Sequence, residues 1–395
     1  MEAMKIDFFQ EEVEELKKKG LHRNLLVIES AQRPRVKVEG RNFLLFSSNN
    51  YLGLANHPQL KKDTKKAIDK YGVGAGASRL ISGNMILHQK LEKKIAEFKE
   101  CEEAIIFTSG YTANIGVIPA LVRSGDLVII DKLCHASIID GCRLSKAKLQ
   151  VYPHRNVEAL ERILKRSDKK ATKRLIITEG IFSLDGDISP LPEILTLAKK
   201  YEALILLDDA HATGVLGKEG RGTCEYFNLK DNCIIQMGTF SKALGSLGGF
   251  VGANKSLIDY LRNKARSFIY STALPPSVIA TSLSALEIVK SNPRPRERLW
   301  KNVNYLKKKL KELGFNLLNT TSPIIPLIVG DNEKTLRVSE SLYQEGILIP
   351  AIRTPTVPKG TERLRITLMA THQKRDLDYL ISVLLELGEK CLLNP

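Results

Sequence analysis

The sequence of 395 residues lacks several features that would assign it to other classes of protein. It has no run of about 20 apolar residues, as a membrane-spanning helix requires, and its charged first 20 residues do not have the apolar segment of a secretory signal. Its six cysteines form no C-x-x-C pair and no zinc-finger spacing, so we expect reduced thiols and no metal site. Without internal repeats or low-complexity segments, the chain is expected to be a cytoplasmic globular protein.

Acidic residues are too few to balance the basic ones, and 60 Lys and Arg against 44 Asp and Glu leave a net charge of +16. Such a charge suits nucleic acid, a membrane surface or an acidic small molecule as partner. The densest basic segments, at 16–20, 61–66 and 306–313, have helical spacing and acidic neighbours, which favours solvated helix faces. We therefore expect no nucleic-acid or membrane partner, and a basic nucleic-acid-binding module is a distant alternative.

Short apolar runs alternate with segments of helical periodicity through the first three quarters of the chain. The runs end abruptly in polar or glycine residues and lie at 104–110, 127–131, 174–180, 203–211, 233–239 and 248–253. This alternation predicts an α/β fold with a mostly parallel central sheet. We expect an N-terminal arm or helix (1–45), a large domain (46–294) and a smaller C-terminal α/β domain (295–395).

One lysine stands in an unusual setting, the stretch "TFSKALGSLGGFVG" at 239–252. Lys242 follows two hydroxyl residues and precedes a glycine cluster, so it could clamp a phosphate, bind an aldehyde covalently or lie in a solvated loop. A P-loop has its glycines before the lysine, which argues against the first reading. The glycines at 72–77 follow a charged helical pattern and not a strand, so they indicate a tight loop and not a dinucleotide site.

Pyridoxal phosphate requires a lysine for its aldehyde, a carboxylate for its pyridine nitrogen and donors for its phosphate. "LLDDAHATG" supplies Asp208 and His211, and "TSGYTAN" supplies Gly110 and Tyr111 at a strand-to-helix turn. Singly, such an aspartate is more often a helix cap and such a histidine a core residue. Together with Lys242, at predicted strand ends where ligands of parallel sheets bind, they favour a pyridoxal-phosphate site.

The chain resembles the α-oxoamine synthases, which are fold-type-I pyridoxal-phosphate enzymes that condense an amino acid with an acyl thioester and release carbon dioxide. The resemblance covers nearly the whole length, in the blocks "SSNNYLGLA", "GASRLISGN", "SGYTAN", "HASIIDG", "EGIFSLDGD", "DDAHATGVLG", "TFSKALGSLGGFVG", "YSTALPP" and "AIRTPTVPKG". It implies a fold-type-I transferase with pyridoxal phosphate as cofactor.

The resemblance also implies roles for individual residues, with Lys242, His135 and Asp208 as the catalytic set. The implied cofactor-binding residues are Lys242 at the aldehyde, Asp208 at the pyridine nitrogen, His211 and Ser183 near the ring hydroxyl, Gly110, Tyr111 and Thr239 around the phosphate, and His135 on the ring face. Thr272 would reach the phosphate of the neighbouring subunit's cofactor, which implies a homodimer with active sites at the subunit interface.

The implied substrate-binding residues are Arg23, Asn49, His135, Arg353 and Thr356. Arg353 lies in a proline-rich turn, and its planar guanidinium is suited to a substrate carboxylate. Residues 351–372 are most similar to family members that join L-alanine to a pimeloyl thioester of CoA or acyl-carrier protein, giving 8-amino-7-oxononanoate for biotin synthesis. Glycine C-acetyltransferase is the alternative. Thr354, where a proline is expected, leaves the acyl chain open, and the sequence alone does not decide between alanine and glycine or between CoA and acyl-carrier protein.

Overall fold

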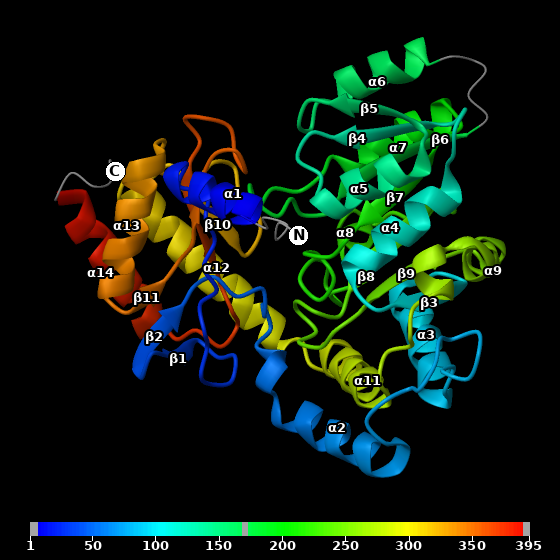
Figure 1. Cartoon of the computed structure of the whole chain (residues 1–395), viewed down its shortest axis with the longest axis horizontal. Coiled ribbons are helices and arrows are strands. Elements are labelled where there is room, and N and C mark those ends of the chain that lie inside the picture. Colours follow the sequence, from blue (N-terminus) through cyan, green and yellow to red (C-terminus); the bar gives the residue numbers. More distant parts are fainter. Residues whose placement is uncertain (1–6, 168–172, 390–395) are drawn as a thin grey trace, which may run out of the picture.

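The structure is a computed structural model that describes residues 7–167 and 173–389, and Figure 1 shows two lobes. The large lobe contains a seven-stranded sheet with the order β3-β9-β8-β7-β6-β4-β5. Its strands are β3 (Glu103–Phe107), β4 (Leu127–Asp131), β5 (Lys148–Tyr152), β6 (Arg174–Glu179), β7 (Leu204–Asp208), β8 (Ile234–Thr239) and β9 (Gly249–Ala253). Strands β4 to β8 are parallel, whereas β9 is antiparallel to both of its neighbours. The predicted mostly parallel sheet is confirmed.

Helices cover both faces of this sheet, so its central strands are apolar almost throughout. Alternate residues of β4 face opposite sides: Val128 and Ile130 pack in one core cluster, and Leu127 and Ile129 pack in another. The first cluster includes α4 (Gly110–Leu121), α5 (Ala136–Ser145), α9 (Lys255–Lys264) and α10 (Arg266–Ile269), and the second includes α6 (Val157–Arg166), α7 (Leu191–Lys200) and α8 (Thr223–Tyr226). Two-sided burial explains why these strands read as continuous apolar runs.

The edge strand β5 is the part of this sheet that the sequence analysis missed. Its sequence, KLQVY, has only Tyr152 fully buried, and among the described residues no strand pairs with its outer side. A half-exposed strand of five residues has no continuous apolar run, which was the signal used for the others.

The small lobe has an antiparallel sheet of β10 (Ile324–Ile328), β13 (Arg363–Thr367) and β12 (Ala351–Ile352). Beside it lie α12 (Arg294–Glu312), α13 (Asn332–Gln344) and α14 (Lys374–Glu389). A second small sheet joins the N-terminal strands β1 (Arg35–Val38) and β2 (Arg41–Leu45) to β11 (Ile347–Leu348). The N-terminal segment, which begins with α1 (Asp7–Lys18), is thus partly built into the small lobe, and the limits 1–45, 46–294 and 295–395 stay predictions.

The remaining elements are the turn η1 (Leu54–Asn56) and the helices α2 (Pro58–Tyr71), α3 (Ile86–Lys99) and α11 (Pro276–Ser291), which pack together at one end of the large lobe. Five cysteines are free thiols, and Cys391 lies outside the described residues. Within the described ranges, no helix combines the length and the apolar composition needed to cross a bilayer.

Candidate active site

A cavity of about 200 Å³ lies at the carboxyl ends of β6, β7 and β8. Residues from five separate segments of the sequence line it, because the ends of parallel strands meet at one edge of a sheet. Seven predicted site residues are among them: Gly110, Tyr111, His135, Asp208, His211, Thr239 and Lys242. The others are Ser109, Asn114, Ser137, Glu179, Ala210, Met237 and Ser241.

Lys242 is half-buried in the loop after β8. Burial lowers the pKa of its ammonium below the ordinary value, the carboxylates of Asp208 and Glu179 oppose this shift, and the charge of Arg365 adds to it. Loss of hydration disfavours the charged form of an amine. A larger fraction of Lys242 is therefore unprotonated near neutral pH than of an exposed lysine, as a nucleophile toward an aldehyde requires.

Asp208 ends β7 and is buried. Its Oδ2 accepts a hydrogen bond from Asn114 Nδ2 at 2.9 Å, and its Oδ1 accepts one from the amide of Ala210 at 3.0 Å. The same Asn114 nitrogen donates to Ser137 Oγ at 2.9 Å. These bonds fix the direction of the Asp208 carboxylate, which is buried and lines the cavity.

Two histidines in the cavity are held in the neutral form. The Nδ1 atom of His211 lies 2.7 Å from the hydroxyl of Tyr51, and burial, with the charges of Lys242 and Arg365, holds the pKa of His211 well below its usual range. His135 precedes α5, where its Nδ1 accepts from the amide of Ser137 at 3.2 Å. Burial also lowers the pKa of His135, against the opposing charge of Asp208. A neutral imidazole can stack on a ring without forming an ion pair with the Asp208 carboxylate.

The N-terminus of α4 forms the opposite part of the site. Ser109 Oγ accepts from the amide of Thr112 at 3.0 Å and caps the helix, and the amides of Gly110 and Tyr111 belong to the first turn, which has no intrahelical acceptors. A Cβ atom at Gly110 would lie 3.2 Å from the Met237 side chain, so the glycine keeps a cradle open. Amides at a helix N-terminus are a general phosphate site.

These residues fit pyridoxal phosphate. One cavity combines an amine of lowered pKa, a fixed carboxylate, two neutral imidazoles and a glycine-lined helix N-terminus. The hydroxyl of Thr239 donates to the carbonyl of Gly248 at 2.7 Å and lies 2.8 Å from Ser241 Oγ, so the two hydroxyls border the same end of the cavity as Gly110.

The other predicted residues do not line this cavity in the single chain. Ser183 and Asn49 are linked to each other by Arg365, whose Nε donates to the Ser183 carbonyl at 2.6 Å and whose Nη2 donates to Asn49 Oδ1 at 3.3 Å. The remaining four lie elsewhere: Arg23 exposed after α1, Arg353 half-buried after β12, Thr356 exposed in the same turn, and Thr272 exposed beside Ser78. Their roles, like those of the cavity residues, stay predictions.

Sequence reasoning assigned no role to two charged residues of the site. Glu179 ends β6, and its Oε1 accepts from the amide of His135 at 2.6 Å. Burial and then the charge of Asp208 raise the pKa of Glu179. Arg365 is buried in β13 of the small lobe. The available signals were an acid at a predicted strand end and, in "RLRIT", two arginines two residues apart within an apolar strand.

Comparisons with known proteins agree with this geometry. The aminotransferase class I and II family matches residues 41–384. The 8-amino-7-oxononanoate synthase of Thermoanaerobacter pseudethanolicus is 49% identical over 98% of each chain, and that of Lysinibacillus sphaericus is 50% identical over 97% of this chain and 98% of its own.

Among solved structures, a serine palmitoyltransferase from S. paucimobilis, with pyridoxal phosphate and myriocin bound, superposes with a TM-score of 0.91 at 33% identity, covering 98% of both chains. An 8-amino-7-oxononanoate synthase from Francisella tularensis superposes with a TM-score of 0.77 at 29% identity, covering 88% of this chain and 99% of that one. The chain, whose cavity combines a lysine, a carboxylate and a glycine at a helix N-terminus, belongs to the aminotransferase class I and II family and has the fold of the fold-type-I pyridoxal-phosphate-dependent transferases.

Proposed function

We propose that this chain is an 8-amino-7-oxononanoate synthase, which condenses L-alanine with a pimeloyl thioester, releases carbon dioxide and serves biotin synthesis. The observation that carries the proposal is full-length identity of 46–50% to relatives of that name, together with the cavity around Lys242. The serine palmitoyltransferase superposes better but is only 33% identical. Backbone likeness reports the shared fold, whereas identity over the whole chain also covers the side chains that choose a substrate.

Bound pyridoxal phosphate supplies an aldehyde for the amino group of the substrate and a ring that accepts electron density from Cα. Lys242 would hold that aldehyde, and its amine of lowered pKa is suited to remove and return a proton at Cα of the amino acid. Asp208 would hold a proton at the pyridine nitrogen, and His135 would contact the ring. The α4 N-terminus, at Gly110 and Tyr111, would hold the phosphate.

Two arginines are available for the carboxylate of the amino acid. Neither lines the cavity, and Arg353, the predicted one, is half-buried in the turn that follows β12. Arg365 is buried, and its charge acts on both Lys242 and His211. We infer that Arg365 is the main cation for this carboxylate, because a desolvated guanidinium close to the reacting groups orients an anion more strongly than a half-exposed one.

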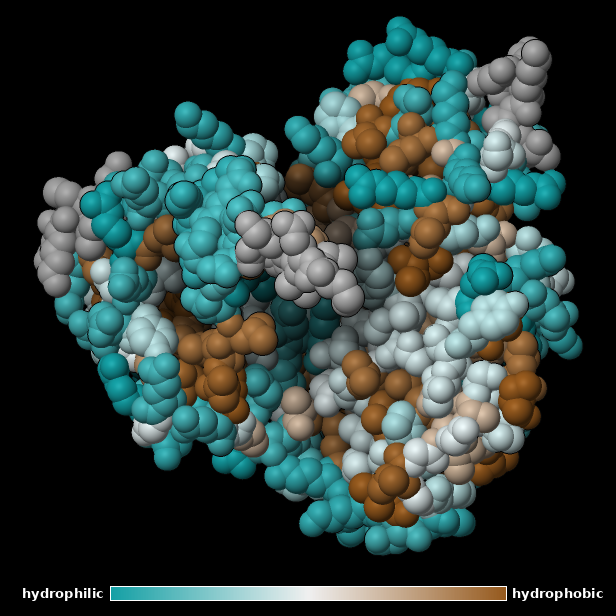
Figure 2. All heavy atoms as spheres, viewed as in Figure 1, coloured by the Kyte–Doolittle hydropathy of each residue, from teal (hydrophilic) through white to brown (hydrophobic). Residues whose placement is uncertain are grey.

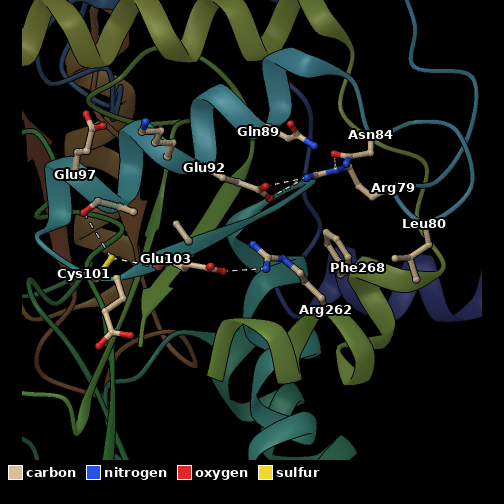
Figure 3. A pocket seen from close by; sticks show the side chains of 14 residues that line it. Arg79, Leu80, Asn84, Gln89, Glu92, Glu97, Cys101, Glu103, Arg262 and Phe268 are labelled. Carbon is tan, nitrogen blue, oxygen red and sulfur yellow. Dashed lines mark hydrogen bonds and ion pairs between the residues drawn. The ribbon is translucent and has the colours of Figure 1, made fainter. Parts of the chain in front are cut away.

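The proposed homodimer is supported by a group of exposed apolar side chains next to Thr272. Leu80 and Ile81 are 56% and 80% exposed, and the segment at 77–78 pairs with the segment at 272–273. Figure 3 shows Leu80 and Phe268 at a pocket of about 630 Å³ in which Arg79 pairs with Glu92. Figure 2 shows further hydrophobic side chains on the face formed by α2, α3 and α11. A second copy of the chain would cover this surface.

We propose a cytoplasmic enzyme whose partners are an amino acid and an acyl thioester of CoA or acyl-carrier protein. The net charge of +16 suits both carriers, since CoA has phosphates and carrier proteins are acidic.

Turnover assays test the proposal. Purified protein with pyridoxal phosphate is given L-alanine plus pimeloyl-CoA, and in parallel glycine plus acetyl-CoA, and thiol release and product mass are measured. We expect the first pair to be preferred at least about 100-fold in kcat/KM, because the second lacks both the methyl group and the long acyl chain. A preference for glycine and acetyl-CoA would instead assign glycine C-acetyltransferase.

A further inference from the structure

Asp208 is followed at the end of β7 by a second acid, Asp209, which does not line the cavity. The two carboxylates have separate partners. Asp208 accepts from Asn114, whereas the Asp209 carboxylate accepts from Lys99 and Thr223. Asp209 is completely buried, so its side chain serves a purpose other than contact with substrate.

Lys99, the last residue of α3, forms an ion pair with Asp209 in which neither side chain is exposed to solvent. The distance from Lys99 Nζ to Asp209 Oδ2 is 2.9 Å, and the lysine also donates to the carbonyl of Arg221. Thr223 donates its amide to Oδ2 at 3.0 Å and its hydroxyl to Oδ1 at 2.6 Å. The carboxylate is therefore held by three donors from two segments.

Two glycines lie against this carboxylate, where a larger residue would not fit. A Cβ atom at Gly180 would lie 2.2 Å from Asp209 Oδ1, and one at Gly222 would lie 2.0 Å from Oδ2. Gly180 directly follows Glu179, which lines the cavity. The ion pair thus lies immediately behind two strand ends that form the site, and a side chain at position 180 or 222 would collide with the Asp209 carboxylate.

The backbone of Asp209 begins the turn that carries the cavity residues. Its amide donates to the Met237 carbonyl on β8 at 2.8 Å, and its carbonyl accepts from the amides of Ala212 at 3.0 Å and Thr213 at 2.9 Å. Buried ion pairs are often replaceable by apolar residues without loss of stability. A pair built so tightly at this turn is better explained by the geometry that it imposes.

We propose that the Lys99–Asp209 ion pair is a positioning device for the cofactor site, which fixes the turn at 208–211 so that Asp208 and His211 keep their directions. This inference rests on the proposed role of Asp208 toward the pyridine nitrogen of pyridoxal phosphate. Lys99 and Asp209 are positioning residues, since neither lines the cavity.

The test compares the holoenzyme with its Lys99→Met variant. We expect the dissociation constant of pyridoxal phosphate to rise at least about 10-fold and kcat to fall by a similar factor, with KM for the thioester changed less than about threefold. The pH midpoint of the visible absorbance of the bound cofactor is expected to shift by about half a unit or more, because the carboxylate at the ring nitrogen is displaced.

Leu160→Ala is the matched control for simple destabilisation. Leu160 is fully buried in α6, in the core cluster on the face of the sheet opposite α4 and α5. Its truncation therefore lowers Tm by leaving a cavity. We expect its cofactor affinity and absorbance midpoint to equal those of the wild type. If Lys99→Met likewise loses only Tm, the positioning role is refuted.

A double variant separates charge burial from positioning. In Lys99→Met/Asp209→Asn the unpaired buried charge is gone, so we expect Tm to return toward the wild-type value while cofactor affinity and kcat stay low. Full recovery of all three would overturn the proposal. If Lys99→Met does not fold, Thr223→Val removes the hydroxyl bond alone and is expected to weaken cofactor binding about threefold, and unchanged binding would contradict it.

Cofactor affinity and absorbance do not depend on which thioester is the substrate. A wrong substrate assignment therefore leaves this test intact, whereas a wild-type protein that binds no pyridoxal phosphate would refute the proposed function itself.

Discussion

The cavity contains a basic group, Lys242, and an acidic group, Glu179, whose pKa values are shifted toward one another. Burial lowers the pKa of the Lys242 ammonium and raises the pKa of the Glu179 carboxyl group. The charge of each group partly opposes the pKa shift of the other. Both groups lie beside Asp208. Because a group exchanges protons best when its pKa is near the working pH, this arrangement suits a site that must remove and return a proton at carbon.

At the scale of single residues, the two arginines give a prediction. Arg365→Lys removes the planar two-point donor beside the cavity, so we expect KM for L-alanine to rise about 10- to 100-fold, with a smaller effect on pimeloyl-CoA. Arg353→Lys is the matched variant in the turn outside the cavity, and we expect it to change KM for alanine less than about threefold. Steady-state kinetics with each substrate varied in turn checks both. A larger effect of Arg353→Lys would show that Arg353, and not Arg365, is the main cation for the substrate carboxylate.

At the scale of elements, the loop 181–188 connects the two lobes. Its ends pair at Ile181 and Ile188, and its Gly186 carbonyl accepts from the amide of Thr321 at 3.1 Å. Asp185 forms an ion pair of 2.7 Å with Arg363 on β13. Since Ser183 lies in this loop, its predicted contact with the cofactor depends on both lobes.

The same loop is fixed from the large lobe by His154. Its Nδ1 lies 2.9 Å from Asp131, at the end of β4, and its Nε2 lies 2.9 Å from Asp187. Burial opposes the charged imidazole, but the hydrogen bonds to Asp131 and Asp187 outweigh it and raise the pKa of His154 to about 9. Two carboxylates on the two ring nitrogens require both nitrogens to be protonated.

We therefore predict a pH-dependent contribution of His154 to stability. A raised folded-state pKa gives stability that is complete below the unfolded pKa of about 6.5 and is lost as pH rises through about 9. His154→Gln is expected to lower the free energy of unfolding by roughly 2–3 kcal/mol at pH 6 and to change it little near pH 10. Denaturant titrations across this range measure it, with His22→Gln, at an exposed histidine, as the control. A difference that does not change with pH would contradict the ion-pair account.

At the scale of the whole molecule, the large lobe lines the cavity, other parts of the chain act on its lining residues through a hydrogen bond or a charge, and the proposed dimer adds a second chain. Tyr51 and Asn49 come from the segment that joins the N-terminal strands to the large lobe, and Arg365 comes from the small lobe. The exposed apolar side chains at 80–81 lie on a surface of the large lobe that no described part of the chain covers.

Ile81→Asp tests the dimer. A charge in an apolar interface is expected to weaken self-association at least about 100-fold, so sedimentation at micromolar concentration should change from twice the mass of the chain to the mass of one. Leu336→Asp, on α13 of the small lobe, places the same charge at another exposed leucine and is expected to leave the dimer intact. If the wild type already sediments as a single chain, the homodimer is wrong.

The sequence alone was enough for features that depend on neighbouring residues. The buried strands around Val128 and Leu206 follow from local apolar runs, and Lys242, Asp208 and His211 follow from residue type at predicted strand ends. Only the tertiary structure decided which distant segments meet: that β9 runs antiparallel, that β2 pairs with β11 about 300 residues later, and that Arg365 contacts Ser183 and Asn49. The order of strands in a sheet, and the burial that shifts a pKa, depend on the packing of the whole chain, which no local pattern contains.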